Sequence, residues 1–127
     1  MGPLKGIKIV EFSGIGPGPF CGMLLADLGA DVIRISRKDA DGMENKFDIH
    51  NRSKKTITAD LKNKETVDEI LKLIEQVDVV FEGFRPGIME KLGLGPNVCL
   101  KINPKLVYGR MTGWGQEGPM SKMAGHD

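Results

Sequence analysis

The alternation of apolar and polar segments along the chain predicts strands that alternate with helices. Residues 7–12 form a short run rich in isoleucine and valine, typical of a buried strand. A glycine- and proline-rich turn at 14–19 follows, and residues 30–36 form a second strand-like run. Between them, apolar residues recur at helical spacing up to a glycine that favours a helix end: Phe20, Met23, Leu24, Leu28 and Gly29. Residues 7–36 are therefore predicted to form a β–loop–α–β unit with parallel strands.

A third strand and an amphipathic helix are predicted after a long polar segment. Residues 37–55 are mainly charged and amide residues, and we expect them to form a loop before a strand at 56–59. Asn63 is suited to capping the next helix, and Glu65 lies where a carboxylate faces the positive end of the helix dipole. The buried stripe of this helix is expected at Val67, Ile70, Leu71, Ile74 and Val77.

Two further strands and two short helices complete the pattern. Strands are predicted at 78–81 and 106–111. Pro86 suits the first turn of a short helix that runs through Leu92, and 96–102 is predicted to form another. This order predicts an α/β fold with an open, Rossmann-like, mostly parallel sheet and helices on both faces.

Composition and charge exclude several classes of protein. The chain has 127 residues, and its 18 lysines and arginines nearly balance 17 acidic residues, whereas nucleic-acid-binding domains usually carry a basic excess. Cys21 and Cys99 stand far apart, which predicts neither a disulfide framework nor a zinc site. No apolar run reaches the roughly 20 residues that span a membrane, and the N-terminus lacks a signal-peptide core. We expect a cytoplasmic protein that binds neither nucleic acid nor membrane.

The glycine turn after the first strand admits three interpretations. Gly14, Gly16 and Gly18 follow a strand and precede a helix, which is the setting of a phosphate-binding loop. The dinucleotide pattern requires a glycine where Pro19 stands, and the second strand ends in arginine and serine instead of the acid that binds a ribose. The turn is thus a tight connection without a ligand, a loop lining some other ligand, or a nicotinamide-nucleotide site.

Basic residues recur near the predicted strand ends. Ligands of open parallel sheets bind outside the carboxyl ends of the strands, where cations would suit a phosphorylated ligand. The candidates, each of which could also be a solvated surface charge, are Arg34, Arg37, Arg52, Lys54, Lys55, Lys62, Arg85 and Lys91. Arg37, Lys62 and Arg85 are favoured because they come just after strands.

The last three residues, Gly125, His126 and Asp127, follow a glycine-rich loop without a further helix or strand. We therefore expect a truncated chain or an incomplete fragment. On spacing alone His126 is either an ordinary surface histidine or a functional one, and the glycine beside it permits close approach to a ligand.

Motifs along nearly the whole chain resemble those of the family III CoA-transferase superfamily and, within it, the α-methylacyl-CoA racemases. They are Pro3-Leu4-x-Gly6-Ile7, Gly14-Ile15-Gly16-Pro17-Gly18-Pro19, Leu25-Ala26-Asp27-Leu28-Gly29-Ala30-Asp31-Val32, Arg52, Thr58-Ala59-Asp60-Leu61-Lys62, Glu82-Gly83-Phe84-Arg85-Pro86-Gly87, Glu90-Lys91-Leu92-Gly93-Leu94-Gly95-Pro96, Met111-Thr112-Gly113-Trp114-Gly115-Gln116 and Ala124-Gly125-His126-Asp127. The final Gly-His-Asp favours the racemases over the transferases.

The resemblance implies a Rossmann-like large domain, of which residues 1–127 would be the N-terminal part, and interlocked homodimers. It implies an acyl-CoA thioester substrate and a role in fatty acid metabolism, with no separate cofactor and no metal. The nucleotide end of CoA would meet Arg37, Ala59, Asp60, Leu61, Lys62, Gly83, Phe84, Arg85 and Lys91, and the thioester would meet Gly125, His126 and Asp127. Some relatives have an arginine where Lys91 stands. The lysine in this chain would replace the bidentate contact of an arginine with a single point charge.

The reaction that the resemblance implies is a 1,1-proton transfer at the α-carbon of a 2-methylacyl-CoA. One base removes the α-proton to give an enolate, and an acid on the opposite face returns a proton and inverts the centre. His126 suits the first role because a histidine pKa of ~6.5 populates both protonation states near neutrality. Asp127 is the second catalytic candidate, and its backbone N–H is a candidate donor to the enolate oxygen.

The second catalytic carboxylate of the racemases lies downstream of Gly-His-Asp, so the resemblance implies that residues 1–127 alone are inactive. Two other functions remain open. One is a CoA-transferase that moves CoA between carboxylic acids through an aspartyl-CoA intermediate, whose aspartate also lies downstream. The other is a CoA-binding module without activity.

Overall fold

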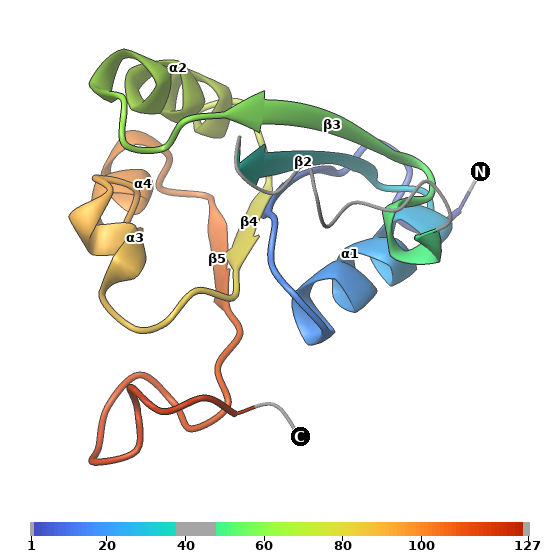
Figure 1. Ribbon diagram of the computed structural model, residues 1–127. Helices are drawn as coiled ribbons and strands as arrows, with labels where there is room; N and C mark the ends of the chain where they lie inside the picture. The colour runs from blue at the N-terminus through green and yellow to red at the C-terminus, as the bar shows by residue number, and fades with distance from the viewer. Residues whose placement is uncertain (1, 38–47, 126–127) are drawn as a thin grey trace.

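Residues 2–37 and 48–125 are described by the computed structural model, and they confirm the predicted alternation of strands and helices (Figure 1). The strands are β1 (Lys8–Phe12), β2 (Asp31–Arg37), β3 (Lys54–Ala59), β4 (Val79–Glu82) and β5 (Val107–Arg110). The helices are α1 (Pro17–Asp27), α2 (Lys64–Ile74), α3 (Ile88–Lys91) and α4 (Pro96–Ile102), with a 3-10 turn η2 (Ile49–Asn51).

The strands form one sheet in the order β3-β2-β1-β4-β5, and each neighbouring pair is parallel. This is the order of the first five strands of the Rossmann fold. Val10 of β1 pairs with Ile33 on one side and with Val80 on the other, so β1 is central. The strand order reverses between β1 and β4, where open α/β sheets characteristically bind their ligands.

Different helices cover the two faces of the sheet (Figure 1). On one face, Ala26 of α1 packs in a small core cluster with residues of three strands: Ile9, Val32 and Phe81. On the other face, α2, α3 and α4 enclose a larger cluster that includes Val10, Phe12, Ile35, Val67, Ile70, Ile74, Val80, Met89, Leu94 and Cys99. The fold therefore has the two-sided α/β architecture that the sequence predicted.

α1 packs closely on its face of the sheet through small residues. Gly22, Met23 and Ala26 are buried, and a Cβ at Gly22 would overlap the Glu11 carboxylate. The helix is where the sequence predicted it, but its long apolar residues lie mostly on the outer side. Phe20 is 48% exposed and Leu24 is 45% exposed.

α2 begins where the sequence predicted it, and Asn63 caps it as expected, but the helix ends at Ile74, so Val77 of the predicted stripe lies beyond it. The Oδ1 atom of Asn63 accepts hydrogen bonds from the backbone N–H groups of Glu65, at 2.9 Å, and Thr66, at 3.4 Å. Of the predicted stripe, Val67, Ile70 and Ile74 are buried.

Two predicted boundaries were wrong. Gly87, in the left-handed region with φ 89°, is the N-cap of α3, so Pro86 precedes this helix instead of forming its first turn. The predicted loop at 37–55 is shorter, because β2 includes Arg37, η2 follows, and β3 begins at Lys54. Residues 38–47 of that loop lie outside the described residues.

Candidate functional site

The carboxyl ends of the five strands lie along one edge of the sheet. The last residues of β1 to β5 are Phe12, Arg37, Ala59, Glu82 and Arg110. The chain leaves this edge through the β1–α1 loop, through the β4–α3 loop and, after β5, through residues 111–125, here called the C-terminal segment. Parallel pairing thus brings together loops that are far apart in the sequence.

A cleft of about 190 Å³ lies where the strand order reverses. Its walls come from the β1–α1 loop, the β4–α3 loop and the C-terminal segment. Most lining residues are apolar or glycine, and Arg85 supplies the positive charge among the described residues that line it. Four residues predicted for the CoA site lie in these walls: Gly83, Phe84, Arg85 and Gly125.

The glycine-rich β1–α1 loop lines the cleft but is poorly suited to bind phosphate. Pro17 and Pro19 occupy the first turn of α1 and have no N–H groups. The N–H of Phe20 is already donated to the Gly16 carbonyl. Gly18 alone among residues 17–19 carries an N–H, so the first turn lacks the array of donors that holds a pyrophosphate. This geometry favours a loop that lines a ligand other than a dinucleotide.

Arg37 and Phe84 meet across the edge of the sheet. The guanidinium carbon of Arg37, at the end of β2, lies 4.3 Å from the ring centroid of Phe84, in the loop after β4. Cation–π attraction holds this stack. The N–H donors of a stacked guanidinium lie in its own plane, so they can still bind a phosphate oxygen. Two residues predicted separately for the nucleotide end of CoA are therefore in contact.

One contact to the β4–α3 loop and two contacts within the C-terminal segment fix the conformation of this segment beside the cleft. Arg85 Nη1 donates to the Lys122 carbonyl at 2.9 Å, and Trp114 Nε1 donates to the Ala124 carbonyl at 3.0 Å. The backbones of Gly113 and Gly125 cross so closely that a Cβ on either would overlap the other. These contacts hold Gly125, the last described residue, in the cleft wall.

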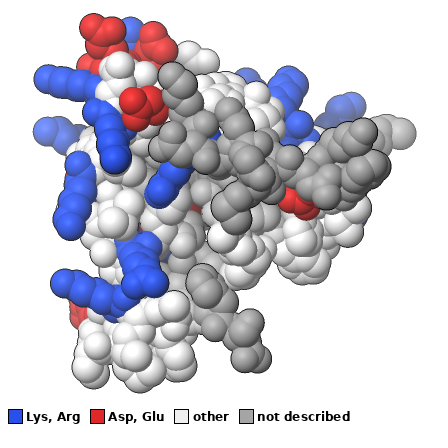
Figure 2. Space-filling view, in the orientation of Figure 1, with Lys and Arg blue, Asp and Glu red and all other residues white. Residues whose placement is uncertain are grey.

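Basic side chains lie along one side of the molecule near this edge, and a second group lies on the opposite side (Figure 2). On the face shown in Figure 2, lysines and arginines follow the side that carries α2, α3 and the C-terminal segment. A group of acidic side chains lies over α2. An anionic ligand that reaches the cleft from this side would meet mainly positive charge.

Not every residue predicted for the site is brought to the cleft. Ala59 and Leu61 are buried in the core, so only their backbone groups are available to a ligand. Asp60 and Lys62 form an exposed turn after β3, in which Asp60 Oδ1 accepts from the Lys62 N–H at 3.0 Å.

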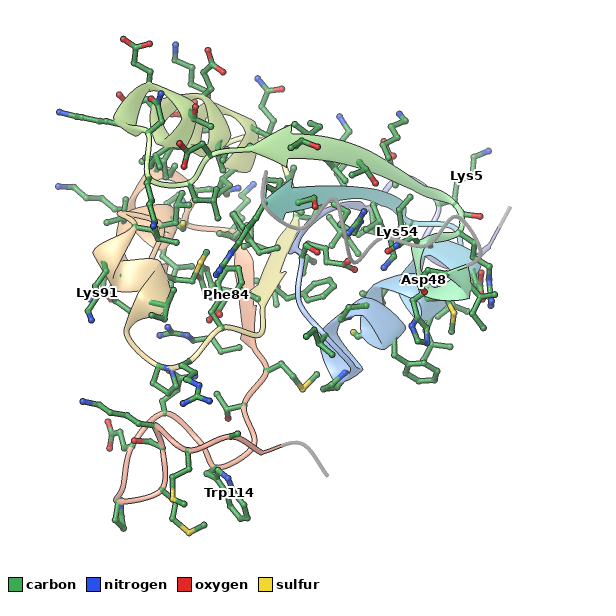
Figure 3. The ribbon with its side chains drawn as sticks, in the orientation of Figure 1. Lys5, Asp48, Lys54, Phe84, Lys91 and Trp114 are labelled. Carbon is green, nitrogen blue, oxygen red and sulfur yellow. The ribbon has the colours of Figure 1, made fainter. Side chains whose placement is uncertain are left out.

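Lys91 lies on the far side of α3 from Phe84 (Figure 3). His126 and Asp127, the two catalytic candidates, lie outside the described residues.

Four of the basic residues considered as phosphate ligands have other roles. Lys54 is fully buried against Glu11, and Arg34 is 5% exposed and donates to Ser13 Oγ at 3.0 Å. Arg52 and Lys55 pair with acidic residues near the amino ends of β2 and β3. The prediction failed for Arg52, Lys54 and Lys55 because all three lie at the amino end of β3, opposite the edge where the carboxyl ends of the strands meet.

Sequence reasoning missed a buried ion pair beneath the β1–α1 loop. Lys54 Nζ lies 2.8 Å from Glu11 Oε1 and 3.0 Å from Oε2, and it also donates to the Pro19 carbonyl at 3.0 Å. Burial raises the pKa of Glu11, and the hydrogen bond and charge of Lys54 oppose this rise. The pair thus connects the edge strand β3 to the first turn of α1. The signal available in the sequence was a glutamate in a run at 7–12 that is apolar apart from this residue and Lys8.

A second buried carboxylate lies beneath the β4–α3 loop. Glu82 is 1% exposed, and its two oxygens accept from Arg110 Nε at 3.0 Å and from the Phe84 N–H at 2.9 Å. Burial raises the pKa of Glu82, while the hydrogen bonds from Arg110 and the Phe84 N–H lower it. Neither Glu82 nor Arg110 stood out in the sequence as a site residue.

Within residues 2–37 and 48–125, no group of three or more histidine, cysteine, aspartate or glutamate side chains is arranged to hold a metal ion. In the same part of the chain, each helix is too short or too polar to cross a membrane.

Comparison with known proteins gives a consistent family match. The model of CoA-transferase family III matches residues 4–127. The chain is 48% identical to alpha-methylacyl-CoA racemase from Mus musculus over 124 residues, which cover 98% of this chain and 32% of the racemase. It is 37% identical to succinate–glutarate CoA-transferase from Agrobacterium fabrum over an alignment of 144 residues, which covers 98% of this chain and 36% of that enzyme.

Solved structures agree with the sequence matches. The crystal structure of a CAIB/BAIF family protein from Brucella suis superposes with a TM-score of 0.90 at 35% identity, covering 99% of this chain and 37% of that one. The chain therefore spans about a third of the length of these relatives. The similar proteins include both a racemase and CoA-transferases.

Proposed function

This chain belongs to CoA-transferase family III, and on that basis we propose that its carboxyl-edge cleft binds an acyl-CoA thioester. The nucleotide end of CoA is assigned to Arg37, Phe84 and Arg85, and the thioester to the region of Gly125. The main support is the contact of Arg37 with Phe84 beside a mostly apolar cleft at the reversal of strand order. Such a site offers positive charge to phosphates and an apolar wall to the rest of the ligand.

The finer proposal is a racemase that inverts the α-carbon of 2-methylacyl-CoA thioesters, as the 48% identity to the mouse racemase suggests. His126 would remove or return the α-proton on one face of an enolate, and the Asp127 N–H would donate to the enolate oxygen. His126 directly follows Gly125, which Trp114 and Gly113 hold in the cleft wall. The second carboxylate would come from beyond residue 127, and no separate cofactor is required.

A CoA-transferase is the second candidate, because the chain is also 37% identical to succinate–glutarate CoA-transferase. In that reaction an aspartate beyond residue 127 would carry CoA between two carboxylic acids. We further propose that the complete protein is a cytoplasmic homodimer that acts in fatty acid metabolism. Exchange of the α-proton of a 2-methylacyl-CoA with deuterated water, without an added acceptor acid, separates the racemase from the transferase.

The CoA site is tested by replacing its two arginines. Arg37→Ala and Arg85→Ala are each expected to weaken CoA binding by about 1.5–3 kcal/mol if each makes a charge-assisted phosphate contact. Isothermal titration of the chain with CoA measures this loss, and Lys101→Ala, at the exposed end of α4, is the matched control. CoA affinity that is unchanged in both arginine variants would rule out the proposed nucleotide site.

A further inference from the structure

The β4–α3 loop, residues 83–87, has no regular secondary structure, yet it supplies Phe84 and Arg85 to the cleft. A loop that binds a ligand needs a support that fixes its conformation, because ordering it during binding would cost affinity. In this structure the support is a set of three charged residues beneath the loop: Glu82, Arg110 and Glu90.

Arg110 contacts the elements at both ends of this loop. Its Nε lies 3.0 Å from Glu82 Oε1, at the end of β4, and its Nη2 lies 2.6 Å from Glu90 Oε1, in α3. The Arg110 side chain is 19% exposed and that of Glu82 is 1% exposed, so solvent screens their ion pair little. One guanidinium on β5 thus contacts both the strand before the loop and the helix after it, although the Glu90 side chain is 45% exposed.

The second oxygen of Glu82 acts on the loop itself. Glu82 Oε2 accepts a hydrogen bond from the Phe84 N–H at 2.9 Å, which fixes the backbone at the residue whose ring carries the Arg37 guanidinium. Hydrogen bonds to a buried carboxylate are stronger than those between neutral groups. A continuous set of contacts therefore runs from Glu90 through Arg110, Glu82 and Phe84 to Arg37.

We propose that Glu82 and Arg110 are positioning residues for the nucleotide end of CoA. They do not touch the ligand but hold Phe84 where Arg37 can stack on it. The inference rests on the proposed function, because it needs CoA to bind at Arg37 and Phe84. Without this role, the ion pairs that Arg110 makes with Glu82 and Glu90 would only connect β4, β5 and α3.

The test compares ligand affinities of variants in the whole 127-residue chain. Glu82→Gln removes the negative charge to which both Arg110 and the Phe84 N–H donate. Arg110→Lys keeps the positive charge but loses the planar guanidinium that contacts two carboxylates. Both are expected to weaken binding of CoA, and of adenosine 3′,5′-bisphosphate, the nucleotide half of CoA, by about tenfold. Glu69→Gln, at an exposed position of α2, is the matched control and should bind CoA like the unmodified chain.

A double-mutant cycle distinguishes positioning from general stability. If Glu82 acts through Arg37, Glu82→Gln should cause little further loss of CoA affinity in an Arg37→Ala background. The Phe84 amide resonance should also shift in Arg110→Lys, which provides a readout if Glu82→Gln does not fold. Full CoA affinity in Arg110→Lys, or fully additive losses in the cycle, would overturn the inference. Absence of CoA binding by the unmodified chain would instead overturn the proposed function, and the inference with it.

Discussion

Buried charged side chains distinguish this sheet from one with a purely apolar interior. Glu11 and Lys54 are both fully buried and make three hydrogen bonds beneath the β1–α1 loop. Removing one partner of such a pair leaves an uncompensated buried charge. The pair also determines the residue above it, because the space next to the Glu11 carboxylate admits only a glycine at position 22.

Gly22→Ala is therefore expected to destabilise the chain by about 1–3 kcal/mol, because the added methyl group overlaps the Glu11 carboxylate. Urea denaturation followed by circular dichroism measures the free energy of unfolding. The control is Gly18→Ala in the same helix, where an added Cβ meets nothing within 4 Å and the backbone φ is not positive. Equal stability of the two variants would show that α1 does not pack on Glu11 as described.

At the scale of elements, hydrophobic spacing together with proline and glycine signals predicted each strand and α-helix seen in residues 2–37 and 48–125 but not η2, and the predicted boundaries were wrong where an element buries few apolar residues. β3 lies at the edge of the sheet and pairs only with β2, so Lys54 and Lys55 resemble loop residues in the sequence although they begin the strand. The burial of Lys54 depends on its contact with Glu11, 43 residues earlier, and local patterns do not encode such a contact. Phe84 was predicted from motif resemblance and Arg85 also from its position just after a strand, whereas their support by Glu82 was found only in the structure.

The cap of α2 gives a test at this scale. Asn63→Ala removes the side-chain acceptor for the N–H groups of Glu65 and Thr66, and it should lower the free energy of unfolding by about 1 kcal/mol. Asn63→Ser keeps a capping oxygen and should recover most of the loss. Urea denaturation measures both variants, and an alanine variant as stable as the unmodified chain would contradict the assigned cap.

For the whole molecule, strand order explains how distant segments form one site. The winding reverses between β1 and β4, which opens a cleft that the loops after β1, β4 and β5 share. This arrangement brings the cleft and the residues proposed to bind the nucleotide end of CoA together within residues 2–37 and 48–125. The proposed two-base reaction needs in addition a carboxylate that the family resemblance places beyond residue 127.

We therefore expect the 127-residue chain alone to show no exchange of the α-proton of a 2-methylacyl-CoA in deuterated water, even where it binds CoA. Proton NMR of the recovered thioester measures the exchange. A longer protein that also contains the region found beyond residue 127 in full-length family members should show exchange. Its His126→Ala variant should lose the exchange while retaining CoA affinity. Turnover by the 127-residue chain alone would contradict the two-base scheme.

Titration of the isotope-labelled chain with CoA, followed by amide NMR, shows whether CoA binds at the carboxyl edge of the sheet. We predict that the resonances which shift will concentrate in residues 12–19, 83–87 and 111–125 and at Arg37. Shifts confined to the opposite edge, where β1 and β4 begin, or no shifts at saturating CoA, would contradict binding at the carboxyl edge.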